Sequence, residues 1–296
     1  MLNLTRPEGS APHDFRLSRR AVGAVFFAGY AVAALSAQAE PVHTDEAGLV
    51  IETVTLAPAD GFKLPAYVAR PAAAGRFPAV LVISEIFGVH DYIKDICRRL
   101  AKLGYVAMAP AFFVRAADPA PLSDMGAIMK IVAQAGDPQV MGDIAAALAA
   151  LKASPHVDAG KLAVTGYCWG GGETWLACEE FADFKAGTAW YGRMTPPAGA
   201  PDDPKRYWPI QRVAHLHAPV LGLYGAKDAL SQQVPAMNEA LKAAGKTDTQ
   251  IVVYPDAGHG FHADYRASYV EADAKDGWAK MLAHFAAHGV GPKAHA

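Results

Sequence analysis

Short apolar runs that alternate with helical segments constrain the fold of this chain more than any other feature of its sequence. The runs are too short for helices and are typical of strands buried on both faces, and they lie at residues 78–84, 105–109, 161–167, 186–191, 219–224 and 250–254. Helical patterns separate or follow them at residues 91–103, 138–153, 170–180, 231–244 and 263–287. This alternation predicts an α/β fold, with a mostly parallel sheet that helices cover on both faces.

The segment before these runs has a different pattern. Residues 50–56 and 63–68 are rich in β-forming residues and flank Asp60-Gly61, a turn dipeptide, which predicts an antiparallel hairpin at the N-terminal edge of the sheet. Residues 111–137 are rich in Pro and Asp, so we expect an irregular excursion with room for one short helix. Because neither a repeat nor a low-complexity linker is visible, residues 40–296 are predicted to form one domain.

The N-terminus has the composition of an export signal. Residues 1–20 are polar with four arginines, residues 21–35 are apolar, and small residues precede a potential cut after Ala39. The Arg19-Arg20 pair indicates a twin-arginine signal, with the general secretion route and an uncleaved membrane anchor as the alternatives. Residues 1–39 are therefore predicted to be a signal peptide, which implies a periplasmic protein without stable membrane association after cleavage.

Composition limits the classes of partner. Hydrophobic residues make up 52% of the 296 residues, which suffices for a full core, and the formal net charge of −2 lacks the basic footprint of a nucleic-acid binder. The three cysteines form no CxxC pair, and the His215/His217 and His284/His288 pairs have no further ligands at metal-binding spacing. We therefore expect no nucleic acid and no metal.

One cysteine lies in a catalytic motif. Gly166-Tyr167-Cys168-Trp169-Gly170 joins a predicted strand to a predicted helix and follows the G-x-nucleophile-x-G pattern of a nucleophile elbow. Such a sharp turn lifts the nucleophile above the sheet at a helix N-terminus, where the helix dipole favours a thiolate. Cys97 and Cys178 lie within predicted helices, and we interpret them as small core residues.

Two further residues complete a possible triad. Asp228 and His259 each follow a predicted strand, and the order nucleophile, acid, histidine is that of α/β-hydrolases. His259 would take the proton of Cys168, and Asp228 would orient the imidazole. Asp256 competes for the acid role but lies only three residues before the histidine, where a turn-forming role is favoured.

Backbone amides are expected to stabilise the oxyanion. One should belong to Trp169, directly after the nucleophile, and the other to Ile86 in the loop after the strand at 78–84. The side chains of four aromatic residues near the elbow could line an apolar pocket or belong to the core: Trp169, Trp175, Trp190 and Tyr191.

Several motifs together resemble the dienelactone hydrolase (carboxymethylenebutenolidase) family. The match runs from about residue 50 to residue 285, and its motifs are Glu85-Ile86-Phe87-Gly88, Ala109-Pro110, Gly166-Tyr167-Cys168-Trp169-Gly170-Gly171, Gly225-Ala226-Lys227-Asp228 and Gly258-His259-Gly260-Phe261. The resemblance implies an α/β-hydrolase fold and hydrolysis of a small-molecule ester or enol-lactone through a thioester acyl-enzyme, without cofactor or metal.

The resemblance also implies roles for single residues. Glu85 matches a glutamate that contacts the resting thiol, and Arg115 matches one of two arginines that bind a substrate carboxylate. The place of the second arginine is apolar here, at Ala263, and Arg266 follows three residues later. The alternatives are a broad-specificity esterase, thioesterase or peptidase on the same scaffold, and a non-catalytic thiol-bearing binding protein.

Overall fold

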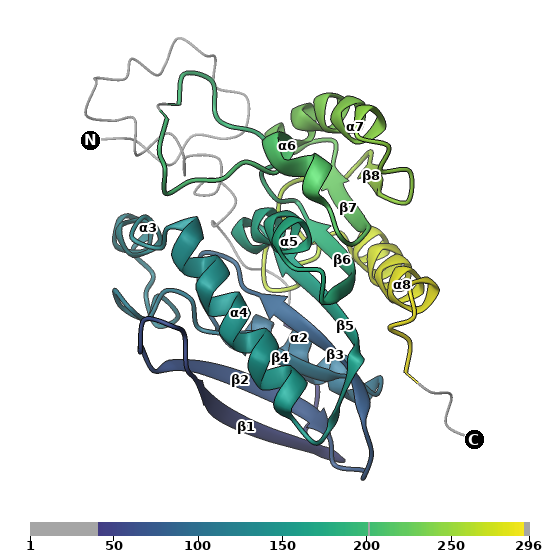
Figure 1. Cartoon of the computed structure of the whole chain (residues 1–296). Helices are drawn as coiled ribbons and strands as arrows, with labels where there is room; N and C mark the ends of the chain where they lie inside the picture. The colour runs from purple at the N-terminus through teal and green to yellow at the C-terminus, as the bar shows by residue number, and fades with distance from the viewer. Residues whose placement is uncertain (1–40, 201, 293–296) are drawn as a thin grey trace.

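An eight-stranded sheet forms the centre of residues 41–200 and 202–292, which are the residues that the computed structural model describes (Figure 1). The strands are β1 (Leu49–Leu56), β2 (Leu64–Pro71), β3 (Phe77–Ile83), β4 (Val106–Pro110), β5 (Val157–Tyr167), β6 (Phe184–Trp190), β7 (Val220–Gly225) and β8 (Gln250–Tyr254). Their spatial order is β1-β2-β4-β3-β5-β6-β7-β8.

The pairing directions confirm the predicted topology. β1 and β2 form the expected antiparallel hairpin, β2 runs antiparallel to β4, and every neighbouring pair from β4 to β8 is parallel. This is the α/β-hydrolase fold that the sequence predicts. Because the strands from β4 to β8 are parallel, their carboxyl ends meet at one edge of the sheet, and the loops there can form a site.

Helices cover both faces of the sheet. They are α2 (Asp91–Lys102), α3 (Met125–Val132), α4 (Asp137–Ala153), α5 (Trp169–Glu180), α6 (Pro209–Arg212), α7 (Val234–Ala243) and α8 (Glu271–Ala287), with the short 3-10 helices η3 (Val213–His215) and η4 (Ala229–Gln233). Figure 1 shows α4 and α5 in front of the sheet and α2 behind it. α3 is the short helix expected within residues 111–137.

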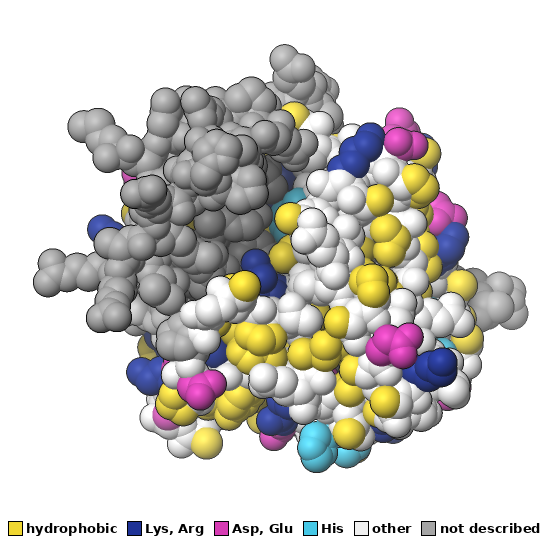
Figure 2. Space-filling model, turned by 90° about the horizontal axis from the view of Figure 1, so that it is seen from above, with side chains coloured by type: hydrophobic (Ala, Val, Ile, Leu, Met, Phe, Trp, Pro, Cys, Tyr) yellow, Lys and Arg dark blue, Asp and Glu magenta, His cyan; other side chains and the backbone are white. Residues whose placement is uncertain are grey.

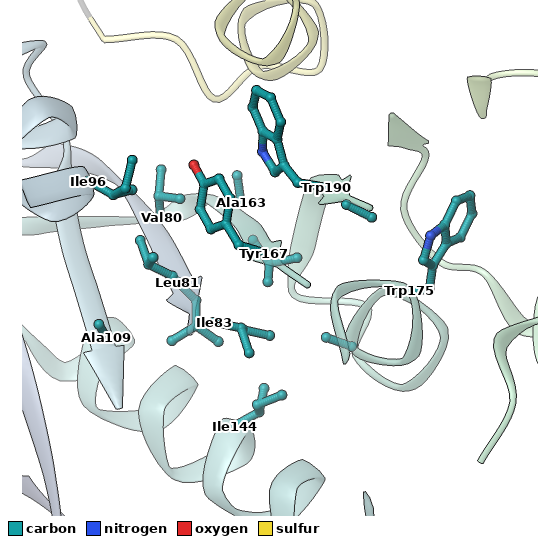
Figure 3. Packing of buried hydrophobic residues seen from close by; sticks show 14 of the residues in the cluster. Val80, Leu81, Ile83, Ile96, Ala109, Ile144, Ala163, Tyr167, Trp175 and Trp190 are labelled. Atoms are coloured by element: carbon teal, nitrogen blue, oxygen red, sulfur yellow. The ribbon is translucent and has the colours of Figure 1, made fainter. Parts of the chain in front are cut away.

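The core is built around the central strand β3. Residues 79–83 are all fully buried, because helices pack against both faces of this strand. In Figure 3, Ile96 of α2 and Ile144 of α4 lie on opposite sides of β3, near Val80 and Ile83 respectively. Burying such aliphatic side chains stabilises the fold by about 1.5–3 kcal/mol each, which explains why β3 has a continuous apolar run and not an alternating one.

The last helix differs from its prediction. α8 begins at Glu271, whereas the sequence pattern predicts a helix from residue 263. Residues 259–270 form successive turns, closed by bonds such as Val270 N–H to the Phe261 carbonyl (3.0 Å). The physical reason is that this segment folds over the sheet edge, where contacts of Tyr265 and Arg266 with the buried Glu85 carboxylate stabilise the turns.

On the face drawn in Figure 2, the described charged side chains of both signs lie scattered among hydrophobic ones. Among the described residues, the helices are all too short or too polar to cross a membrane. The predicted signal peptide, residues 1–39, lies outside the described residues.

Candidate active site

Cys168 occupies a strained turn between β5 and α5. Its φ of +59° and ψ of −116° lie outside the regions that L-residues ordinarily adopt. Two backbone bonds hold it there: Cys168 N–H donates to the Trp190 carbonyl, and Gly171 N–H donates to the Cys168 carbonyl, both at 3.0 Å. Such strain costs about 1–3 kcal/mol and is concentrated at functional sites.

The flanking glycines are required by close backbone contacts. A Cβ at Gly166 would lie 2.1 Å from the Gly170 carbonyl oxygen, and a Cβ at Gly170 would lie 2.4 Å from the Ile83 carbonyl oxygen. Contacts this short cannot be relieved by side-chain movement, because the opposing atoms are backbone. The turn has the geometry that the G-x-nucleophile-x-G pattern predicts.

His259 and Asp228 are joined at the same edge. His259 Nδ1 and Asp228 Oδ2 are 2.7 Å apart and both side chains are buried, while the other Asp228 oxygen accepts from Leu230 N–H at 3.0 Å. Burial by itself lowers the pKa of His259, but Asp228 and then Cys168 outweigh it and raise this pKa to about 10. The structure therefore brings Cys168, His259 and Asp228 together, in contrast to Asp256, which pairs with Lys227 at the surface.

The two expected oxyanion amides belong to neighbouring segments. Trp169 is the first residue of α5, and Ile86 follows β3 in a turn closed by Gly88 N–H to the Glu85 carbonyl (3.1 Å). A Cβ at Gly170 would lie 2.6 Å from the Ser84 carbonyl oxygen, so the elbow packs directly on the end of β3. This packing holds the backbone at Trp169 next to the start of the loop that contains Ile86.

Glu85 is fully buried and held by three side chains. Tyr265 donates its hydroxyl to Glu85 Oε2 (2.7 Å), His90 Nε2 lies 3.3 Å from the same oxygen, and Arg266 Nη2 lies 2.9 Å from Oε1. Burial raises the pKa of Glu85, but Arg266 and then His90 and Tyr265 lower it to about 2. Glu85 is therefore ionised at neutral pH and forms the centre of a buried polar cluster.

Sequence reasoning missed most of this cluster. The sequence motifs assign no role to His90 or Tyr265, and they relate Arg266 only to the place of a second arginine. The spacing offers a weak signal for His90, five residues after Glu85, but Tyr265 lies 180 residues away from that carboxylate. Only the folded loop at residues 259–270 brings Tyr265 and Arg266 back to the end of β3.

Arg115 is engaged by carboxylates of the protein itself. Its guanidinium pairs with Asp60 (2.7 Å) and with the buried Asp143 (2.5 Å), and it stacks on Phe62 with 4.2 Å to the ring centroid. A substrate carboxylate would have to compete with both aspartates. These contacts favour a structural role for Arg115 over the substrate-binding role predicted from the sequence.

Cys97 and Cys178 are fully buried free thiols, and burial raises the pKa of each well above its usual value. Within the described part of the chain, His, Cys, Asp and Glu side chains do not gather in any group of three or more that could hold a metal.

Comparison with known proteins places the chain in a family. The sequence profile described as the dienelactone hydrolase family matches residues 64–289. The chain belongs to the dienelactone hydrolase family. A candidate carboxymethylenebutenolidase of Methylorubrum extorquens is 46% identical over 282 residues, covering 93% of this chain and 94% of that protein. One from Salmonella typhimurium is 44% identical over 265 residues, covering 88% of this chain and 96% of the other.

A crystal structure supports the same family assignment. That of a candidate dienelactone hydrolase from Klebsiella pneumoniae superposes with a TM-score of 0.75 at 43% identity, covering 80% of this chain and 98% of that one. The family resemblance predicted from the sequence motifs is thus confirmed, and the protein is a hydrolase of the dienelactone hydrolase family.

Proposed function

We propose that this hydrolase cleaves small-molecule esters or lactones with Cys168 as nucleophile, His259 as base and Asp228 as the group that orients the base. The observation that carries the proposal is the strained elbow at Cys168 beside an imidazole that Asp228 holds at 2.7 Å. A buried thiol without this context would not require a positive φ or two glycines in backbone contact. The arrangement therefore argues against a non-catalytic thiol-bearing binding protein.

The proposed reaction has two stages. His259 Nε2 takes the thiol proton, the Cys168 thiolate attacks the carbonyl carbon, and the Trp169 and Ile86 amides stabilise the oxyanion. The tetrahedral intermediate then collapses, and the bond between the carbonyl carbon and the leaving oxygen breaks. The leaving oxygen receives the proton from the His259 imidazolium, and the acyl group stays on Cys168 as a thioester. Water then attacks the thioester with His259 as base, releasing the carboxylic acid and the thiol.

The charges around the site favour substrates without a carboxylate. Arg115 is ion-paired with two aspartates, Ala263 occupies the place of the second arginine, and the nearby Arg266 is ion-paired with Glu85. We therefore favour a broad-specificity carboxylesterase that acts on neutral esters and lactones over a hydrolase selective for dienelactone.

We also propose that the protein is exported to the periplasm. The Arg19-Arg20 pair and the apolar stretch after it support transport to the periplasm by the twin-arginine route. A folded chain crossing the membrane would keep the buried Cys97 and Cys178 away from the disulfide machinery.

The decisive experiment compares the three cysteines in one esterase panel. Cys168→Ala is expected to abolish hydrolysis of p-nitrophenyl acetate and neutral lactones, with an unchanged circular dichroism spectrum. Cys97→Ala and Cys178→Ala serve as matched controls and should retain turnover, because Cys97 is buried within α2 and Cys178 is buried within α5, ten residues after Cys168. Turnover that survives Cys168→Ala in a folded sample would rule out the proposed nucleophile.

A further inference from the structure

Tyr191, which directly follows β6, has an unusual backbone and an unsatisfied side chain. Its φ is +41°, and among the described residues only Cys168 is another non-glycine residue with positive φ. Its side chain is fully buried, and within residues 41–200 and 202–292 the hydroxyl has no hydrogen-bond partner. A strained backbone and an unpaired buried hydroxyl are each unfavourable, so their coincidence beside the nucleophile calls for a functional reason.

The backbone around Tyr191 is clamped to the elbow. Tyr191 N–H donates to the Leu223 carbonyl of β7 (2.8 Å), and the carbonyl of the preceding Trp190 accepts from Cys168 N–H. On the other side, a Cβ at Gly192 would lie 2.2 Å from the backbone of Gly171. These contacts fix the Tyr191 backbone relative to Cys168, so its ring cannot easily turn away to find a partner elsewhere.

The ring lies against the proposed base. The Tyr191 and His259 ring centroids are 5.1 Å apart in an edge-to-face arrangement, and the ring also packs on Phe261 at 5.5 Å. Burial raises the pKa of Tyr191 well above its usual value, and the neighbouring Glu85 charge raises it further. The hydroxyl is therefore a neutral group that can donate a proton in a hydrogen bond but will not become a phenolate.

These observations identify the missing partner as an atom of the substrate. We propose that the Tyr191 hydroxyl donates a hydrogen bond to the leaving oxygen of the bound ester or lactone, on the side where His259 delivers its proton. This inference rests on the proposed function, because it needs His259 as the acid in acyl transfer. Tyr191 would stabilise the negative charge that develops on that oxygen as its bond to carbon breaks.

The test is Tyr191→Phe, which removes only the hydroxyl. We expect kcat/KM for an alkyl ester such as ethyl butyrate to fall about 10- to 100-fold, the effect of losing one hydrogen bond in the transition state. The loss should be smaller for p-nitrophenyl butyrate, whose leaving oxygen is a weak base and needs less assistance. The thermal midpoint should stay constant or rise, because the variant no longer buries an unpaired hydroxyl.

Tyr224→Phe is the matched control. Tyr224 is also fully buried near the carboxyl edge of the sheet, but its hydroxyl accepts a bond from Trp175 Nε1 at 3.2 Å. Removing the Tyr224 hydroxyl should lower the thermal midpoint and leave kcat/KM unchanged for both esters, the reverse of the result expected for Tyr191→Phe.

The outcomes separate the two proposals. Unchanged kcat/KM in Tyr191→Phe, or equal losses for the alkyl and p-nitrophenyl esters, would overturn the role of Tyr191 while an inactive Cys168→Ala keeps the proposed function intact. Full activity of Cys168→Ala in the same assays would instead overturn the proposed function, and the role of Tyr191 with it.

Discussion

Replacing Arg266 with Met should leave an unbalanced negative charge in the interior. Arg266 and Glu85 are both almost completely buried, and their closest polar atoms are 2.9 Å apart. Methionine keeps an unbranched apolar side chain in place of the arginine stem but removes the charge. Tyr265 and His90 would remain beside Glu85, yet neither carries the permanent charge of a guanidinium.

The magnitude follows from the pKa of Glu85. Burial opposes ionisation, but Arg266 and the weaker contributions of His90 and Tyr265 lower this pKa from 4.5 to about 2. Each pKa unit is worth about 1.4 kcal/mol, so the ionised carboxylate contributes about 3 kcal/mol to the free energy of unfolding at pH 7. Arg266 supplies the largest favourable part, and breaking a buried ion pair typically costs about 3–5 kcal/mol. We therefore expect Arg266→Met to lower the free energy of unfolding by about 3 kcal/mol.

The contribution of ionised Glu85 to the free energy of unfolding should be stabilising in the natural protein and destabilising in Arg266→Met. In the natural protein the Glu85 contribution is complete above pH 4.5 and is lost as the pH falls toward 2, because the folded-state pKa is depressed. In Arg266→Met burial dominates, and the folded-state pKa rises above 4.5. The carboxylate then destabilises the fold at pH 7, and this penalty shrinks as acidification protonates it. The difference between the two proteins should therefore narrow from pH 7 to pH 5.

Urea unfolding followed by tryptophan fluorescence measures both effects, since urea does not screen charge. The double variant Arg266→Met/Glu85→Gln removes the unpaired charge and should recover at least half of the lost stability. A loss below about 1 kcal/mol at pH 7 would refute the reasoning. So would a difference that stays constant from pH 7 to pH 5, or a double variant no more stable than the single one.

Three further predictions concern other charged residues. Asp228→Asn should lower kcat by orders of magnitude and add little to the effect of Cys168→Ala, because the two residues act as one unit. Replacing the exposed Asp256 with Asn should leave kcat nearly unchanged, and the opposite ranking in steady-state assays would assign the acid role to Asp256. Arg115→Met should reduce the denaturation midpoint and change KM equally for anionic and neutral esters, because its contacts are protein carboxylates; a rise in KM confined to anionic esters would restore its substrate-binding role. Changing both Arg19 and Arg20 to Lys should abolish the mature periplasmic form in cell fractionation, and undiminished export would leave only a general secretion signal.

Local patterns in the sequence were enough to predict the sheet and the sharp turn at Cys168. The apolar runs predicted the positions of the parallel strands, since a strand buried on both faces needs apolar residues at consecutive positions. The glycines at 166 and 170 predicted the turn at Cys168, because only glycine avoids the backbone contacts of 2.1 and 2.4 Å found there. These features depend on neighbouring residues and could be read from a few positions along the chain.

The surroundings of the site were decided by tertiary structure alone. Arg266 could be weighed as an anion-binding residue from its position near His259, but its pairing with Glu85 depends on how residues 259–270 fold over the end of β3. In the same way, Asp60 and Asp143 reach Arg115 from segments that are distant along the chain. The unpaired hydroxyl of Tyr191 had no signature in the sequence, where the residue could equally belong to the core. Ion pairs and unsatisfied groups depend on distances between remote segments, and those distances exist only once the sheet and its loops have packed.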